Sequence, residues 1–290
     1  MSVSRLQIVG TALLFSTGGT AIKAADHMSG LQVACFRSAV AALTIALFVP
    51  AARRGWSWRT LLVAVAFAAT LILFVNANKL TTAANAIFLQ ETSLIYILLI
   101  GPLFLHERLR LLDVVTIAVF VGAIGLFFLD TDQATHAATN PTLGNALALA
   151  SGVGWAFTIT GLRWLGKSSG AEHAAAAAVA GNLLAALVCL PFAVPTTTDG
   201  GDWLAILYLG IFQIGLAYGL LTRAVQRIHA VEASLLLMVE PALSPVWAWI
   251  VHHERPGPWA ITGGVVIILG TIAWSLLDAQ LARSAPAPAT

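Results

Sequence analysis

The stretch that decides the fold is residues 231–255, VEASLLLMVEPALSPVWAWIVHHER, an apolar run with Glu240 near its middle and a His-Glu-Arg triplet at its end. An earlier stretch, residues 82–108 (TAANAIFLQETSLIYILLIGPLFLHER), has the same design, with Glu91 near its middle and the same closing triplet. The two glutamates lie 149 positions apart in a chain of 290 residues. Because self-similarity at a fixed spacing indicates an internal repeat, we interpret the chain as one half repeated once.

The composition is that of a membrane protein. Hydrophobic residues make up 59% of the chain and charged residues 10%, with a mean hydropathy of +0.87, whereas an average soluble domain carries about 25% charged residues. The net charge of +2 is small and the lysines and arginines are scattered, which argues against a nucleic-acid partner. Cys35 and Cys189 each lie inside an apolar run, so we interpret them as buried hydrophobic side chains and expect no disulfide, metal or cofactor.

Ten apolar runs are long enough to span a bilayer as helices, which takes about 20 residues each. They cover residues 5–24, 31–51, 58–78, 82–105, 111–129, 142–164, 172–194, 203–222, 230–251 and 257–277. The runs do not alternate in polarity, as barrel strands would. The predicted fold class is therefore all-α: a polytopic membrane protein with ten transmembrane helices in two five-helix repeats, 5–130 and 142–278, and a disordered cytoplasmic tail at 279–290. The first run is not interpreted as a cleavable signal peptide, because residues 10–18 resemble residues 144–152 at the start of the sixth run.

The positions of lysine and arginine predict the orientation, because these residues favour cytoplasmic connections. Eleven lie on the side that holds both termini: Arg5, Arg53, Arg54, Arg59, Arg108, Arg110, Arg163, Lys167, Arg223, Arg227 and Arg283. Four lie on the other side: Lys23, Arg37, Lys79 and Arg255. We therefore expect a bacterial inner-membrane protein with both termini in the cytoplasm. Five spans per repeat then place the two halves upside down relative to each other, so that the triplet 106–108 lies inside and the triplet 253–255 outside.

An inverted repeat favours transport. Two antiparallel halves around an axis in the membrane plane supply two near-equivalent conformations, open to opposite sides, with a site at the midplane between them. An intramembrane enzyme is not indicated, because neither HExxH nor GxSxG occurs in the chain. The predicted partners are a small-molecule substrate and the lipid bilayer, and the sequence does not decide between monomer and oligomer.

The arrangement resembles the EamA-type transporters of the drug/metabolite transporter superfamily, and within them the YddG-type exporters of aromatic and other amino acids. The residues that carry the resemblance are Glu240-Pro241, Glu107 and Glu254 at the ends of the fourth and ninth runs, and the glycines of the fifth and tenth runs at 122–125 and 263–270. The resemblance implies an exporter with a central cavity lined by spans 1, 3, 4, 6, 8 and 9. The first half departs from the pattern at Thr92, where a proline is expected, which leaves open whether both halves bend alike.

The two midspan glutamates are the sharpest polar signal, because an ionisable group at the bilayer centre costs roughly 2.5–3.5 kcal/mol. On a continuous fourth helix Asn85, Thr92 and Tyr96 share one face and Glu91 lies on another. We therefore favour a structural role for Glu91, with substrate contact as the alternative. In the ninth span Glu240 and Ser244 share a face, where the neighbouring prolines free backbone carbonyls; a plain kink is the alternative.

Other spans offer further polar or aromatic positions. The sixth places Ser151, Trp155 and Thr158 on one face, where the tryptophan either stacks on a substrate or packs between helices. Lys23 and Asp26 lie near the outer end, where either they form a gate with Arg37 or Lys23 is a lysine that extends to the membrane interface. The predicted substrate-binding set is Thr17, Asn76, Asn85, Thr92, Tyr96, Ser151, Trp155, Thr158, Tyr218, Glu240 and Ser244, with Gln213 beside Tyr218 in the eighth span. The favoured function is export of aromatic and other neutral amino acids by alternating access; the alternative is export of another metabolite or a cationic drug, with proton coupling undecided.

Overall fold

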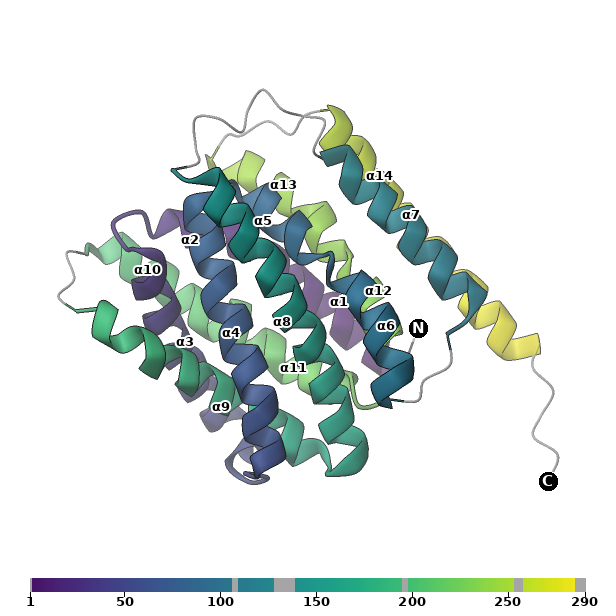
Figure 1. The fold of residues 1–290 in the computed structure, drawn as a ribbon, viewed down its shortest axis with the longest axis horizontal. Helices are drawn as coiled ribbons and strands as arrows, with labels where there is room; N and C mark the ends of the chain where they lie inside the picture. The colour runs from purple at the N-terminus through teal and green to yellow at the C-terminus, as the bar shows by residue number, and fades with distance from the viewer. Residues whose placement is uncertain (1, 106–108, 128–138, 195–197, 253–257, 285–290) are drawn as a thin grey trace.

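The computed structural model describes residues 2–105, 109–127, 139–194, 198–252 and 258–284. The two His-Glu-Arg triplets, 106–108 and 253–255, and most of the connection between the repeats lie outside the described residues. Every described element is helical (Figure 1). The fold is therefore all-α, as predicted.

The helices follow the ten predicted spans closely. The first half comprises α1 (Val3–Ser16), α2 (Gly18–Ala24), α3 (Gly30–Phe48), η1 (Pro50–Arg53), α4 (Trp58–Leu80), α5 (Ala83–Gln90), α6 (Ser93–Leu105) and α7 (Leu111–Phe127). The second half comprises α8 (Pro141–Ser168), α9 (Ala171–Cys189), η3 (Leu190–Phe192), α10 (Gly200–Tyr208), η4 (Leu209–Leu216), α11 (Ala217–Ala224), α12 (Ala230–Leu237), α13 (Val239–His252) and α14 (Pro258–Ser284). Eight of the described helical stretches are long and apolar enough to cross a membrane, and Leu111–Leu126 is a shorter apolar helix.

Polar side chains set where several helices begin. Ser29 and Gln32 form a reciprocal capping box at the start of α3, and Asp199 and Asp202 form one at the start of α10. Such boxes satisfy backbone N–H groups that have no partner within the helix. The second of these boxes also fixes the position of two carboxylates at one end of the bundle.

The two halves pack against each other in a pattern that is unchanged when their spans are exchanged. Helix α4 lies against α8 and α9, α3 lies against α9 and η4, and α1 lies against α11 and α13. These pairs correspond to spans 3–6, 3–7, 2–7, 2–8, 1–8 and 1–9. With the contacts of α5 and α6 against α8, which are spans 4–6, exchanging the repeats maps the set onto itself. The direction of the spans also alternates, as an inverted arrangement requires. Ion pairs join the starts of α1, α7 and α12, in spans 1, 5 and 9, to the last part of α14, which is span 10. The centre of the molecule therefore lies between the repeats.

Helices α7 and α14 lie side by side at the edge of the bundle (Figure 1), where α14 also contacts α13. Their contact needs a glycine, because a Cβ on Gly270 would lie 2.6 Å from the ring of Phe120. Helix α14 continues to Ser284. Residues 279–284, which the sequence assigned to a disordered tail, are therefore helical, since the chain continues its last span without a breaking residue.

The fourth and ninth spans are broken at matching positions. Glu91 caps the end of α5, and Met238, 147 residues later, caps the end of α12. The first half thus breaks without the proline that the family pattern has there. Thr92 takes its place: its hydroxyl donates to the carbonyl of Leu89 at 2.7 Å and so competes with the helical backbone bonds. Pro102, in contrast, lies inside a continuous α6.

The first span is broken in the same way. Thr17 lies between α1 and α2, and its hydroxyl donates to the carbonyl of Leu14 at 2.7 Å. A threonine that bonds to the carbonyl three residues earlier therefore marks both breaks in the first half. The phenolic oxygen of Tyr208 lies 2.9 Å from the Thr17 hydroxyl and joins this break to α10.

Candidate functional site

A cavity at the centre of the bundle receives side chains from both repeats. Its volume is about 30 Å³, measured as the space open to the centre of a water-sized sphere, which is room for about two water molecules. The lining residues are Phe15, Arg37, Thr70, Leu71, Phe74, Gln90, Trp155, Gln213, Ile214, Tyr218 and Glu240. The cavity must therefore widen before it can hold a molecule as large as an amino acid.

Arg37 brings a positive charge to this cavity. It is the eighth residue of α3, about 10 Å along the helix at 1.5 Å per residue, and only 1% of its surface is exposed. Its Nη2 donates to the carbonyl of Leu71 at 3.4 Å, while Nε and Nη1 have no partner in the described part of the chain. The expectation that Arg37 lies at the outer end with Lys23 and Asp26 was wrong, and the second span joins the six that the family resemblance implied.

Glu240 brings a carboxyl group to the same cavity. It follows the break at Met238 and lies in the first turn of α13, where the helix dipole favours a carboxylate. Its exposed fraction is 7%. Arg37 and Glu240 do not form an ion pair with each other. Two opposite charges thus line one buried cavity, and neither neutralises the other directly.

Two amides complete the polar lining. Gln90 Nε2 donates to the hydroxyl of Ser151 at 3.2 Å, which holds the fourth span against the sixth. Gln213 approaches Gly18 so closely that a Cβ there would lie 2.7 Å from Gln213 Nε2. The carbonyl oxygen of Gln213 is buried and has no partner. The cavity therefore offers a free hydrogen-bond acceptor beside its two charges.

Aromatic rings form the apolar part of the lining. The ring of Phe15 lies 6.0 Å from Trp155 and 5.2 Å from Tyr218, and Trp155 lies 6.3 Å from Tyr218. These separations fall within the range of favourable edge-to-face contacts. The three rings come from the first, sixth and eighth spans, so they meet only at the interface between the repeats.

The eighth span reaches the cavity through an unusual backbone. Residues Leu209–Leu216 form a π-helix, in which each N–H bonds to the carbonyl five residues earlier. Gln213 and Tyr218 are five residues apart and would point about 140° apart on an ordinary α-helix. The wider turns bring both side chains to the cavity, which explains how two positions with incompatible α-helical directions share one site.

Three of the predicted site residues line the cavity: Trp155, Tyr218 and Glu240. Two more lie directly behind it, since Ser151 accepts from Gln90 and the hydroxyl of Thr158 lies 3.4 Å from that of Thr70. Six lie outside the lining: Thr17, Asn76, Asn85, Thr92, Tyr96 and Ser244. Thr17, Asn76 and Thr92 each donate to a carbonyl of their own span.

The fourth span contributes Gln90 to the cavity and not the face of Asn85 and Tyr96. The prediction of that face assumed a continuous helix with a rotation of 100° per residue. The break after Gln90 ends this regular rotation, so the predicted face does not continue across it. Glu91 is buried outside the lining.

Sequence reasoning missed Phe15, Arg37, Thr70, Leu71, Phe74, Gln90 and Ile214. Thr70 and Phe74 are four residues apart on α4 and could have been recognised as one helical face. Arg37 carried a stronger signal, because it lies well inside an apolar run with no acidic residue within one helical turn. Its distance from the start of the run at residue 31 is the feature that indicates burial and not an interfacial position.

Ionic contacts join four helices at the end of the bundle where the chain begins. Arg5 contacts Glu232 at 2.8 Å and also contacts Asp278, and Arg110 contacts both Asp278 and Asp113, the latter at 2.9 Å. We call these five residues the Arg5–Arg110 network. The hydrogen bond from Arg110 to Asp113 raises the pKa of Arg110. The network ties α1, α7, α12 and α14 together at one end of the cavity-forming helices.

Comparison with known proteins identifies the family of the chain. The model of the EamA-like transporter family matches residues 4–129 and 142–276. Relatives include an uncharacterized transporter of Archaeoglobus fulgidus, 26% identical over 67% of both chains, and the pseudopaline exporter CntI of Pseudomonas aeruginosa, 26% identical over 93% of this chain and 95% of the relative. The threonine/homoserine exporter RhtA of Salmonella typhimurium is 31% identical over 47% of this chain and 46% of its own length.

A solved crystal structure has the same fold. It covers 97% of this chain and 99% of its own chain with a TM-score of 0.78 at 20% identity. The family match covers both halves of the chain, at the two segments that the sequence analysis identified as repeats. The chain therefore belongs to the EamA-like transporter family and is a multi-pass membrane transporter.

Proposed function

We propose that this transporter exports neutral amino acids, aromatic ones among them, by alternating access through the central cavity. The observation that carries the proposal is the pair Arg37 and Glu240, two opposite charges that line one buried cavity without contacting each other. Burying an unpaired charge is costly. A site that keeps one charge of each sign suits a ligand that also has one of each.

A free amino acid is such a ligand. Its carboxylate matches the guanidinium of Arg37, which can donate to it from Nε or Nη1, the nitrogens without a partner among the described residues. Its ammonium group has three donors and no acceptor, so it matches the carboxylate of Glu240 and the carbonyl oxygen of Gln213, which has no partner among the described residues. The polar lining thus has a partner for each charged end of the substrate.

The aromatic rings suit the side chain of the substrate. Phe15, Trp155 and Tyr218 offer both ring faces and ring edges within one cluster. An aromatic substrate gains stacking there, and a small neutral one gains burial alone. We therefore expect aromatic amino acids to bind more tightly than alanine or threonine.

The direction of transport and the location of the protein are inferred from its relatives and from the charge distribution. RhtA and CntI are exporters, and the excess of arginine and lysine on the side of the two termini is typical of a cytoplasmic face. We infer a bacterial inner-membrane protein with both termini in the cytoplasm.

Export of a cationic drug or another metabolite is the second candidate. The burial of two carboxyl groups, Glu91 and Glu240, favours it, because buried carboxyl groups attract protons or cations. Arg37 disfavours it, because a cation without an anionic group would leave the guanidinium unpaired. The two candidates therefore differ in their need for a carboxylate on the substrate.

Efflux from proteoliposomes tests the proposal. Vesicles containing the purified protein are loaded with radiolabelled phenylalanine, and unlabelled phenylalanine, phenethylamine and 3-phenylpropionate compete for efflux at equal concentration. We expect only phenylalanine to compete, because each analogue lacks one of the two charges. Equal competition by phenethylamine would favour the cationic candidate, and no efflux of any amino acid would refute the proposed function.

A further inference from the structure

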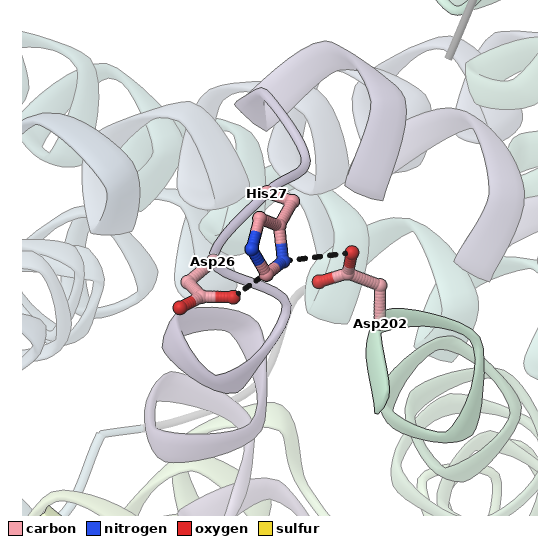
Figure 2. Close-up of side chains that lie close together, drawn as sticks. All are labelled: Asp26, His27 and Asp202. Carbon is pink, nitrogen blue, oxygen red and sulfur yellow. Dashed lines mark ion pairs between the residues drawn. The ribbon is translucent and has the colours of Figure 1, made fainter. Parts of the chain in front are cut away.

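A group of polar side chains lies at the end of the bundle opposite the Arg5–Arg110 network. Asp26 and His27 follow α2, and Asp202 lies in the first turn of α10. Figure 2 shows the ring of His27 between the two carboxylates. We call Asp26, His27 and Asp202 the His27 cluster. It joins the first span of one repeat to the eighth span of the other.

The geometry around one ring nitrogen is unusual. His27 Nδ1 lies 3.0 Å from Asp26 Oδ1 and 3.2 Å from Asp202 Oδ2, and a third carboxylate oxygen, Asp199 Oδ2, lies at 3.9 Å. A ring nitrogen carries at most one proton, so one N–H cannot donate a full hydrogen bond to each of the three oxygens. A cation bound between these atoms could contact all of them.

The hydrogen bonds of Asp202 also favour a bound cation. Asp202 is 1% exposed, yet its Oδ1 has no hydrogen-bond partner among the described residues. Its Oδ2 accepts from the backbone N–H of Asp199 at 3.1 Å, which orients the carboxylate. Both oxygens are directed toward His27 and Asp26 (Figure 2). A buried, oriented and partly unpartnered carboxylate beside a histidine is the donor set of a metal site.

Three carboxylates, Asp26, Asp199 and Asp202, outnumber the two lysines near the cluster. Lys79 acts electrostatically on Asp26 and Asp202, but its ammonium group donates to the carbonyl of Ala25 and forms no ion pair with a described carboxylate. Lys23 lies near Lys79. Asp26 and His27 are largely exposed, with side-chain exposures of 74% and 56%, so an ion can enter from the solvent.

We propose that Asp26, His27 and Asp202 form a binding site for a divalent transition-metal ion of the zinc class, which links the two repeats at this end of the transporter. The ligand atoms all lie within 4.8 Å of one another. A tetrahedral zinc ion with bonds of about 2.0–2.2 Å would hold them about 3.3–3.6 Å apart, so the two distances from His27 Nδ1, 3.0 and 3.2 Å, need to lengthen by only a few tenths of an ångström. Asp199 is the fourth ligand or holds a metal-bound water. The imidazole selects zinc, cobalt or nickel over calcium and magnesium.

Metal binding by the purified protein tests the site without any measurement of transport, so its outcome is independent of the proposed function. The full chain in detergent is stripped with a chelator and titrated calorimetrically with zinc chloride. Cobalt(II) is then added as a visible-absorption probe of four-coordinate geometry. We expect one equivalent of zinc whose binding depends on His27, and no displacement by a tenfold excess of calcium.

Three variants separate this site from adventitious binding. His27→Ala and Asp202→Asn should each weaken the binding of that equivalent at least tenfold, and asparagine at 202 still caps α10 through its side-chain oxygen. His173→Ala is the matched control, because His173 also lies beside a carboxylate, Glu172 at 3.8 Å, but outside any such cluster. Zinc affinity unchanged in His27→Ala, displacement by calcium, or no binding by the parent chain would each overturn the proposal.

Discussion

Replacing Arg37 by methionine should abolish recognition of the substrate carboxylate and at the same time stabilise the protein. The two effects have one cause, because the guanidinium is buried with Nε and Nη1 unpartnered until a carboxylate arrives. Methionine is unbranched and fills the space without polar groups. A residue whose removal improves stability and destroys activity is retained for function.

The structure sets the size of both effects. Each buried donor without a partner costs about 1–3 kcal/mol, and the one hydrogen bond that Arg37 makes, 3.4 Å to the carbonyl of Leu71, is too long to offset two of them. We expect a gain of at least about 2 kcal/mol, or about 4–8 °C in thermal midpoint. A hydrogen bond to a charged group contributes about 1.5–3 kcal/mol, so KM for phenylalanine should rise about 10- to 150-fold.

Two assays on one preparation measure these effects: thermal unfolding in detergent followed by tryptophan fluorescence, and phenylalanine efflux from proteoliposomes. Arg37→Lys keeps the charge without the planar fork and should show an intermediate KM. Arg59→Met is the control, because that guanidinium lies over the rings of Trp58 and Trp164, away from the cavity. Wild-type KM in Arg37→Met would refute the assignment of the carboxylate partner, and a lower midpoint would refute the argument that the charge is unpaired.

Three further changes have defined outcomes. Trp155→Ala should raise KM for phenylalanine about tenfold by removing one ring of the aromatic cluster, with a smaller effect on alanine; equal effects on both substrates would contradict an aromatic subsite. Glu240→Gln should reduce efflux at least tenfold, whereas Glu91→Gln, outside the lining, should retain most of it; the reverse order in the same efflux assay would exchange their roles. Asp278→Asn should lower the thermal midpoint by a few degrees, because Asp278 accepts from both Arg5 and Arg110; an unchanged midpoint would show that the Arg5–Arg110 network does not contribute to stability.

The helical spans could be predicted from the sequence because each depends on a local property. A run of about 20 apolar residues forms a helix in a bilayer whatever surrounds it. The repeat could be recognised for the same reason, since Glu91 and Glu240 lie in runs of similar composition. The family match at residues 4–129 and 142–276 rests on these same patterns.

The site could be predicted only where helical geometry stays regular. Trp155 lies on the unbroken α8, and its direction follows from its neighbours at Ser151 and Thr158. Gln90 could not be predicted, because the break at Glu91 ends the rotation on which a helical face depends. The break itself is formed by Thr92, whose hydroxyl bond to a backbone carbonyl leaves no clear mark in the sequence.

Arg37 could not be placed for a different reason. A lone arginine in an apolar run is usually near an interface, because its long side chain reaches water. Its burial depends on the third, eighth and ninth spans closing around it, which is a tertiary property. The His27 cluster likewise joins residues about 175 positions apart in the chain, a proximity that no local spacing reveals.

The π-helical segment Leu209–Leu216 gives the eighth span a degree of freedom that rigid helices lack. A π turn contains one residue more than the α turn it replaces, and that surplus residue can move along a helix by exchanging one set of backbone bonds for the next. Each such step rotates the side chains it passes while the two ends of the helix stay in place. If the extra residue moved toward Ala217, the side chain of Gln213 would rotate away from the cavity and an aliphatic side chain would take its place. The eighth span could then change its cavity lining without moving as a whole.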